Sequence, residues 1–456
     1  MTTTNTQGVG STAGDLVRDA LATRDFSTAT LAQAKRCLLD YLSCAFEALP
    51  LPWSLQAAAL AAQAPEAQGA HLVGRAGTYR PGDAAFANAV AGHGLVREDM
   101  HAGSVAHLGV VVWPTALALA EQHPVTGAQV LAAAIVGYET GARLGRAVIT
   151  PPLARLFRPT GLVGPFAAAM TGARLAGLDE ARALHAFGLA GNCCAGLNEW
   201  AHTGGSEMYF HPGFAVRNAL ACLDLARQGA QASASILEGQ AGFFQAYARA
   251  PLQEDIVLFA DGRAEIDAVF NKPVPACNFA QSPCQAALQA WRQVSTRRID
   301  AVRIETTDAA VRYPGCDAMG PFQHALQAKM SIPFGVAATL ARGVIAEDNY
   351  RRLDDAEVGR LVAATTLCAD AAYSAAFPAR QGARVTLLLE DGSSVGAAQD
   401  DVVAADDALI RQRFRQAAAA VLGADTAARI EDLVDRYELV PDAAALPRLC
   451  AAAATA

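Results

Sequence analysis

One stretch of this chain, Asn88 to Pro114 (NAVAGHGLVREDMHAGSVAHLGVVVWP), concentrates histidines and charged residues between two apolar, alanine-rich segments. Burying such polar groups without partners would cost about 1–3 kcal/mol for each group. The stretch is therefore either an exposed loop or the wall of a polar pocket, and we favour the pocket. Its candidate residues are His93, Arg97, Glu98, Asp99, His101 and His107.

The length of 456 residues exceeds what one simple core needs, so we expect two domains. Hydrophobic residues make up 52% of the chain and charged residues 18%, and the many alanines are typical of closely packed helices. We predict a mainly α fold. A large all-helical domain occupies residues 1–265, a smaller α+β lid domain occupies 266–402, and C-terminal helices at 403–456 return to the helical domain.

The predicted lid domain contains a small sheet. The segment IDAVRIETTDAAV alternates apolar and polar residues, as a half-buried strand does. The segment ARVTLLLEDGSSVGAA is typical of a hairpin whose turn lies at Asp391-Gly392.

Charge and composition narrow the partners. The net charge of −8 argues against nucleic acid, although a site for an anionic small molecule needs only a few local cations. No apolar run has the length and flanks of a membrane span, and the N-terminus lacks the basic start and apolar core of a signal peptide. The ten cysteines form no CxxC pair and are expected to be reduced core thiols. We therefore expect a cytoplasmic protein.

Three further segments carry groups suited to binding or acid–base chemistry. Arg158 precedes a predicted helix and is either a carboxylate clamp or a surface arginine. Tyr209 and His211 lie just before another predicted helix, where N–H groups favour an anion, or else belong to a surface loop. Lys272 lies among prolines at the domain boundary, as a carboxylate ligand, a base or a plain surface lysine. We interpret Lys329 as a charge on a helix face.

The polar stretch suits acid–base chemistry, because imidazole titrates near neutrality and a nearby carboxylate fixes its tautomer. Asp99, His101 and His107 could instead bind a metal, but no compact ligand motif supports this and we predict no metal. His93 is expected to be a satisfied core histidine. Cys277 is a candidate nucleophile, although a packed thiol is the plainer interpretation.

Several segments resemble, in order, those of the MmgE/PrpD superfamily, which includes 2-methylcitrate dehydratase, cis-aconitate decarboxylase and iminodisuccinate epimerase. AKRCLLDYLSCAFEAL resembles the family's opening helix, and AAFANAVAGHGLVREDMH followed by AHLG resembles its Asn…His segment with an acidic pair and histidines. NKPVPACNFAQSP is similar to the Lys-Pro-Tyr-Pro-x-Cys signature, and LQAKMSIPFGVA to the helix after the substrate loop. Between them, in family order, lie GYETGARLG, RPTGLVGPFAAAMTGARLAGL, AFGLAGN and ILEGQAGFF.

This resemblance implies a homodimer with a site between the helical domain and the lid that uses no cofactor. It implies a small-molecule di- or tricarboxylate substrate that loses a proton α to a carboxylate. By position, the resemblance places Asp99, His101, His107 and Lys272 among the site residues.

The chain departs from the family pattern at several site positions. Glu98 and Met100 stand where the family has Asp and Thr in its Asp-Asp-Thr run. Arg158 replaces a histidine, Met208 a lysine, and Gln281 a histidine common in the dehydratases. Epimerisation of an iminodisuccinate-like acid is therefore favoured, because it protonates no leaving group. The alternatives are a 2-methylcitrate dehydratase-like hydro-lyase, a decarboxylase of a cis-aconitate-like acid, and a non-catalytic carboxylate-binding relative.

In the predicted reaction, His107 or Lys272 acts as the base and Tyr209 or His101 as the opposing acid. Asp99 orients a histidine. Positive charge stabilises the enolate-like intermediate, and closure of the lid excludes water. The predicted substrate-binding residues are Arg158, Arg97, His211 and Gln281.

Overall fold

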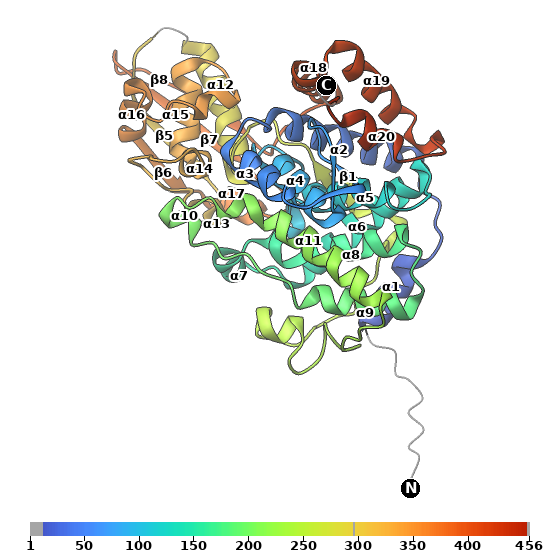
Figure 1. The fold of residues 1–456 in the computed structure, drawn as a ribbon. Coiled ribbons are helices and arrows are strands. Elements are labelled where there is room, and N and C mark those ends of the chain that lie inside the picture. Colours follow the sequence, from blue (N-terminus) through green and yellow to red (C-terminus); the bar gives the residue numbers. More distant parts are fainter. Residues whose placement is uncertain (1–11, 295–296, 454–456) are drawn as a thin grey trace.

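The computed structural model describes residues 12–294 and 297–453. It confirms the predicted mainly α fold, in which a large helical part lies beside a smaller part that contains a four-stranded sheet (Figure 1). One hydrophobic core draws on residues between 13 and 269 and between 405 and 450. A second core draws mainly on residues between 274 and 389.

The helical part is built around α5 (Gly109–Ala120), α6 (Gly127–Val148) and α8 (Pro159–Leu175), most of whose residues are buried. Small residues let these helices approach closely: a Cβ added to Gly137 of α6 would lie 2.0 Å from Oγ1 of Thr171 in α8. The elements of this part are α1 (Thr12–Leu21), α2 (Thr28–Glu47), α3 (Pro52–Ala61), β1 (Pro65–His71), β2 (Thr78–Tyr79), α4 (Pro81–His93), α5 (Gly109–Ala120), α6 (Gly127–Val148), α7 (Pro151–Leu156), α8 (Pro159–Leu175), α9 (Glu180–Gly191), α10 (Trp200–Thr203) and α11 (Glu207–Arg227).

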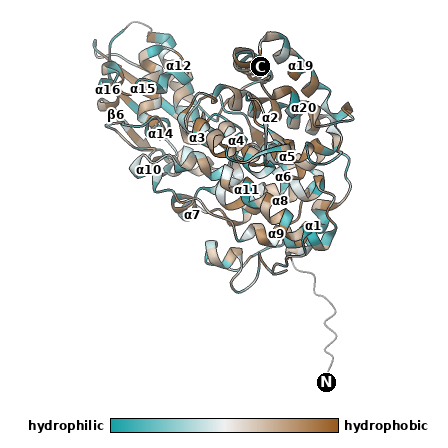
Figure 2. Cartoon of the chain, in the orientation of Figure 1, coloured by the Kyte–Doolittle hydropathy of each residue, from teal (hydrophilic) through white to brown (hydrophobic). Residues whose placement is uncertain are grey.

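Figure 2 shows mostly hydrophobic ribbon at the centre, around α5 and α8, and hydrophilic segments at the periphery, as on α1. This distribution follows from burial, because apolar area removed from water stabilises the fold by about 25 cal/mol per Å². Among the described helices, none combines the length and apolar character needed to cross a membrane.

The smaller part contains the predicted hairpin and the predicted strand at 299–306, together with a strand at 365–369 that the sequence pattern did not predict. Strands β7 (Ala383–Leu389) and β8 (Ser394–Gln399) pair antiparallel around the turn at Asp391-Gly392. Strand β5 (Ile299–Thr306) pairs antiparallel with β7 and parallel with β6 (Thr365–Ala369), so the sheet order is β6-β5-β7-β8. The helices here are α12 (Gln281–Val294), α13 (Asp308–Val311), α14 (Ala325–Met330), α15 (Ile332–Arg342), α16 (Ala356–Ala363) and α17 (Ala371–Ala376).

The last helices lie beside α2 of the helical part rather than beside the sheet (Figure 1). The ring of Phe414 in α18 packs edge-on against Phe46 of α2, with centroids 6.2 Å apart. These helices are α18 (Asp407–Leu422), α19 (Ala424–Asp435) and α20 (Ala445–Cys450).

The polar stretch joins α4 to α5 and is buried, so it is not an exposed loop. Its short strand β3 (Met100–His101) pairs antiparallel with β4 (Val269–Phe270), where Met100 faces Phe270 across the ladder. This pairing brings the polar stretch next to the segment that contains Lys272, at the junction of the two parts.

Candidate active site

A buried carboxylate, Glu98, lies between two histidines. It accepts a hydrogen bond from Nδ1 of His93 at 2.7 Å and lies 3.3 Å from Nδ1 of His107. All three side chains are less than 5% exposed. Burial opposes ionisation of Glu98, but the ring N–H groups of His93 and His107 and the ammonium of Lys272 outweigh it and lower the pKa of this carboxyl. Glu98 is therefore a fixed negative charge in the site.

His107 presents one ring nitrogen for proton transfer. Its Nδ1 lies 2.9 Å from the carbonyl oxygen of Asp99, which accepts but cannot donate, so Nδ1 carries the proton and Nε2 has the lone pair. The backbone N–H of His107 donates to Oγ1 of Thr160 at 3.0 Å and fixes the chain there. Burial and the charge of Lys272 lower the pKa of His107, so the imidazole is neutral before substrate enters.

Arg158 carries a buried positive charge with unused hydrogen-bonding capacity. It occupies the N-cap position of α8, and its Nη2 donates to Nε2 of His93 at 3.3 Å. Its Nε has no hydrogen-bond partner within the described part of the chain, although the residue is 6% exposed. His93 thus links Glu98 to Arg158, and the free donor of Arg158 can receive a carboxylate.

Lys272 and Lys329 bind consecutive backbone carbonyls and hold two loops together. Nζ of Lys272 donates to the carbonyls of Val96 and Ala276, while Nζ of Lys329 donates to those of Leu95, at 2.8 Å, and Pro275, at 3.0 Å. Burial lowers the pKa of Lys272, whereas Glu98 opposes this shift. Lys329 also pairs with Glu347 at 2.7 Å and is 2% exposed, so its interpretation as a helix-face charge is wrong.

Tyr209 and His211 lie inside α11, which begins at Glu207, and not before a helix as the sequence suggested. The Tyr209 ring stacks on Trp53 with centroids 3.7 Å apart, and its hydroxyl has no partner among the described residues. His211 Nδ1 also lacks a described partner, and burial together with Arg158 lowers the pKa of His211 to about 3. Both side chains are buried and neutral, and each has an unused hydrogen-bonding atom.

The cavity at this cluster is nearly closed. The space open to the centre of a water molecule is about 10 Å³, which is room for roughly one water. Arg158 and His107 line it from the helical part, and Cys277, Tyr313 and Met330 from the other side. A dicarboxylate therefore fits only after the two sides move apart.

Two residues of the polar stretch have roles other than those predicted. The sequence assigns Asp99 to orient a histidine, but its carboxylate accepts from the Tyr138 hydroxyl and from the N–H of Gly109, so it stabilises the start of α5. Burial raises the pKa of Asp99 to about 7. His101 follows Met100 on β3, so it points away from the cavity that Met100 lines. It is held instead by Ser104 and Glu265, each at 2.8 Å.

Arg97 and Gln281, which were predicted to bind substrate, instead hold neighbouring segments of the chain in place. Arg97 donates to Glu47 at 2.6 Å and to Oγ of Ser43 at 3.0 Å, which fixes the loop to α2. The Gln281 amide accepts from the N–H of Val274 at 2.9 Å and donates back to its carbonyl at 3.0 Å. Neither side chain lines the cavity described above.

Sequence reasoning missed Glu98 as the central carboxylate and Tyr313 altogether, whereas His93 is, as expected, a buried histidine with both ring nitrogens hydrogen-bonded. The five-residue separation of His93 and Glu98 across the end of a helix was a usable signal, because it allows both side chains to turn inward.

The sulfur of Cys277 lies 3.6 Å from the sulfur of Cys316. The hydrogen bond between these two thiols lowers the pKa of Cys277 to about 7, although burial acts in the opposite direction. No grouping of three or more metal-binding side chains occurs in residues 12–294 and 297–453.

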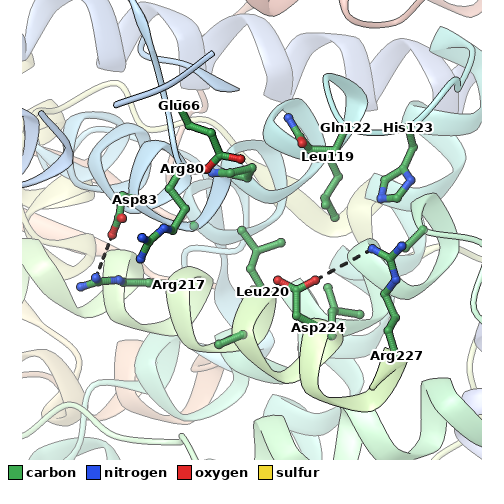
Figure 3. A pocket seen from close by; sticks show the side chains of 15 residues that line it. Glu66, Arg80, Asp83, Leu119, Gln122, His123, Arg217, Leu220, Asp224 and Arg227 are labelled. Carbon is green, nitrogen blue, oxygen red and sulfur yellow. Dashed lines mark ion pairs between the residues drawn. The ribbon is translucent and has the colours of Figure 1, made fainter. Parts of the chain in front are cut away.

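A separate surface cleft of about 600 Å³ lies over α11 and the start of α4 (Figure 3). Arg217 pairs there with Asp83 at 2.8 Å, and Arg227 lies 3.9 Å from Asp224. Because charges of both signs already pair within it, we assign this cleft no ligand.

Comparison with known proteins places the chain in a family of this architecture. Residues 18–254 match the MmgE/PrpD N-terminal domain and residues 274–439 match the MmgE/PrpD C-terminal domain. The chain belongs to the MmgE/PrpD family, as its sequence motifs predict.

Among curated proteins, the chain is similar to fungal enzymes of this family. It is 26% identical to a cis-aconitate decarboxylase-like protein of Aspergillus oryzae, over 98% of both chains. It is also 26% identical to a cis-aconitate decarboxylase of Aspergillus terreus, over 94% of this chain and 93% of that protein. These names support an enzyme of the lyase type and give no support to the epimerase prediction.

Proposed function

We propose that this protein is a decarboxylase of a cis-aconitate-like tricarboxylate and needs no cofactor for the reaction. The observation that carries the proposal is a narrow cavity lined by His107 and Arg158, with Glu98 lying 3.3 Å from Nδ1 of His107. The charge of Lys272 acts on both Glu98 and His107. The names of the similar fungal proteins support decarboxylation among the reactions that such a site suits.

The reaction requires two events at the substrate. The bond between carbon and the leaving carboxylate breaks, CO2 departs, and the electron pair moves through the adjacent double bond to the far carbon, next to a second carboxylate. A proton is then added at that far carbon, so one proton is consumed for each CO2 released. The chain must therefore stabilise the transient dienolate and deliver one proton.

Arg158 and Lys272 supply the stabilisation. The unpartnered Nε of Arg158, which lines the cavity, places positive charge where the dienolate charge develops. The fully buried ammonium of Lys272 adds positive charge from outside the cavity lining. The cavity has room for only about one water molecule, so these interactions are stronger there than in bulk solvent. A dry environment also favours loss of a charged carboxylate as neutral CO2.

His107 is the proposed proton carrier. Its imidazole is neutral in the free protein, but a trianionic substrate in the cavity raises its pKa, because a nearby negative charge favours the protonated form. Protonated at Nε2, it can deliver the proton to carbon. Tyr209, with its unpartnered hydroxyl, is the second candidate donor.

Epimerisation and dehydration remain to be tested against this proposal. Met208, whose sulfur lies 3.2 Å from Nε2 of His93, stands where the family commonly has a lysine. This loss removes one proton donor, which hampers departure of hydroxide more than departure of CO2.

One assay separates the three reactions. Cis-aconitate, 2-methylcitrate and iminodisuccinate are incubated with the protein in D2O and followed by proton NMR. We expect cis-aconitate to release CO2 and to yield an unsaturated dicarboxylate with one deuterium on carbon. Deuterium exchange without CO2 would indicate an epimerase, and an alkene formed from 2-methylcitrate without CO2 would indicate a hydro-lyase.

A further inference from the structure

A second cavity, of about 340 Å³, lies directly outside the site cavity, on the seam between the helical part and the sheet-containing part. Ile149 and Ala154 line it from the helical part, and Phe377 from the other side. It shares three lining residues with the site cavity: Val105, Phe279 and Tyr313. The two spaces are thus separated by one layer of side chains.

This layer is built from side chains of both parts of the fold. The ring of Phe279 packs between Tyr313, at 5.3 Å, and Phe377, at 5.9 Å. Val105, on the opposite side, has a φ of 52°, a conformation that is unfavourable for a β-branched residue. A shift of these side chains would join the two cavities without unfolding either part.

The chemistry of the outer cavity differs from that of the site. Aliphatic and aromatic side chains form much of its wall. Its charged lining residues are Arg155, Asp308 and Arg312. Arg312 and Asp308 pair with each other at 2.8 Å at the exposed rim, and Arg155 is also exposed to solvent. The inner cavity can hold carboxylates at Arg158, whereas the outer cavity offers mainly contacts for hydrocarbon.

We propose that the outer cavity is a subsite for an apolar substituent, so that the substrate is a polycarboxylate bearing an alkyl chain. The inference rests on the proposed function, since it takes the carboxylate end to lie beside Arg158 and His107. The chain would pass between Val105 and Phe279 and end against Ile149. Each methylene group buried there strengthens binding about fourfold.

The test uses two matched series, each with no substituent, methyl, butyl or hexyl. Cis-aconitates substituted at the CH2 carbon are assayed for kcat/KM, and alkylsuccinates, which cannot react, are assayed for Kd by calorimetry. We expect kcat/KM to rise and Kd to fall with chain length, by at least tenfold from no substituent to butyl. The Ile149→Asn variant places an amide in the wall of the outer cavity, where Ile149 is half-buried. In this variant, the increase in kcat/KM and the decrease in Kd from no substituent to butyl should each be at least tenfold smaller.

Leu156→Asn is the matched control, because Leu156 is 65% exposed on α7 and does not line the cavity. It should retain the full gain with chain length. If unsubstituted cis-aconitate reacts but longer chains bring no gain in either series, the subsite is refuted and the proposed function stands. If no acid reacts but alkylsuccinates still bind more tightly with chain length, the decarboxylase proposal fails and the subsite stands.

Discussion

Replacing Glu98 by glutamine tests whether this carboxylate, and not Asp99, organises the site. The substitution keeps the shape of the side chain but removes its negative charge. The wild-type carboxylate accepts a hydrogen bond from His93 at 2.7 Å and interacts with the charge of Lys272. Loss of a hydrogen bond to a buried charged group costs about 1.5–3 kcal/mol of unfolding free energy. Loss of the group that orients the His93–Arg158 link should also lower kcat about 100-fold, equivalent to about 2.7 kcal/mol.

The stability that Glu98 contributes should change with pH in a defined direction. The pKa of Glu98 is lowered in the folded state, so its contribution to stability is present above the ordinary carboxyl pKa of about 4.3 and is lost as the pH falls. Urea unfolding should therefore show the two proteins furthest apart near pH 7 and closer together in acid.

The matched control is Glu347→Gln, which removes the carboxylate that pairs with buried Lys329 at 2.7 Å outside the cavity. This variant should lose stability while kcat stays near the wild-type value. A Glu98→Gln protein with wild-type kcat and wild-type unfolding free energy would refute the reasoning.

Further expected outcomes concern the neighbouring groups. His107→Gln and Lys272→Met should each lower kcat at least about 100-fold in the NMR assay; near-normal rates in both would overturn the proposed roles. Tyr209→Phe removes a hydroxyl without a described partner, so unfolding free energy should not fall, while kcat falls if this hydroxyl donates the proton. The pKa of Asp99 is raised to about 7, so the stability contributed by its protonated form is lost as the pH rises from about 4 through 7. In urea unfolding, this lowers the free energy of unfolding by up to about 4 kcal/mol. The Asp99→Asn variant should show a flatter dependence of unfolding free energy on pH over the same range. Treatment with a chelator should leave activity unchanged.

Apolar flanks and family motifs singled out the stretch before α5, Arg158 and Lys272, and the structure brings these three segments together as buried polar groups. The direction of the individual side chains could not be predicted in the same way. The sequence could not predict that Glu98, and not Asp99, would face the histidines. This orientation depends on Val96, whose φ of 57° turns the chain just before both carboxylates. A β-branched residue rarely adopts that conformation, and nothing local in the sequence signals it.

The burial of Lys329 escaped prediction for a related reason. Its partner Glu347 lies 18 residues away, beyond α15, so no helical spacing connects them. Long-range pairs of this kind depend on how the elements pack together, and their members look like ordinary surface charges in the sequence.

The two most unusual site residues are best understood together. By resemblance to the family pattern, Arg158 stands in the place of a histidine and Met208 in the place of a lysine, and both contact the same atom, Nε2 of His93, at 3.3 Å and 3.2 Å. Compared with that pattern, α11 lacks a lysine charge and the start of α8 carries an arginine charge, beside the same imidazole ring. A site altered in this way can still hold a polycarboxylate, but its charge is arranged for a differently shaped one, which agrees with a substrate that extends toward the apolar cavity beyond Phe279.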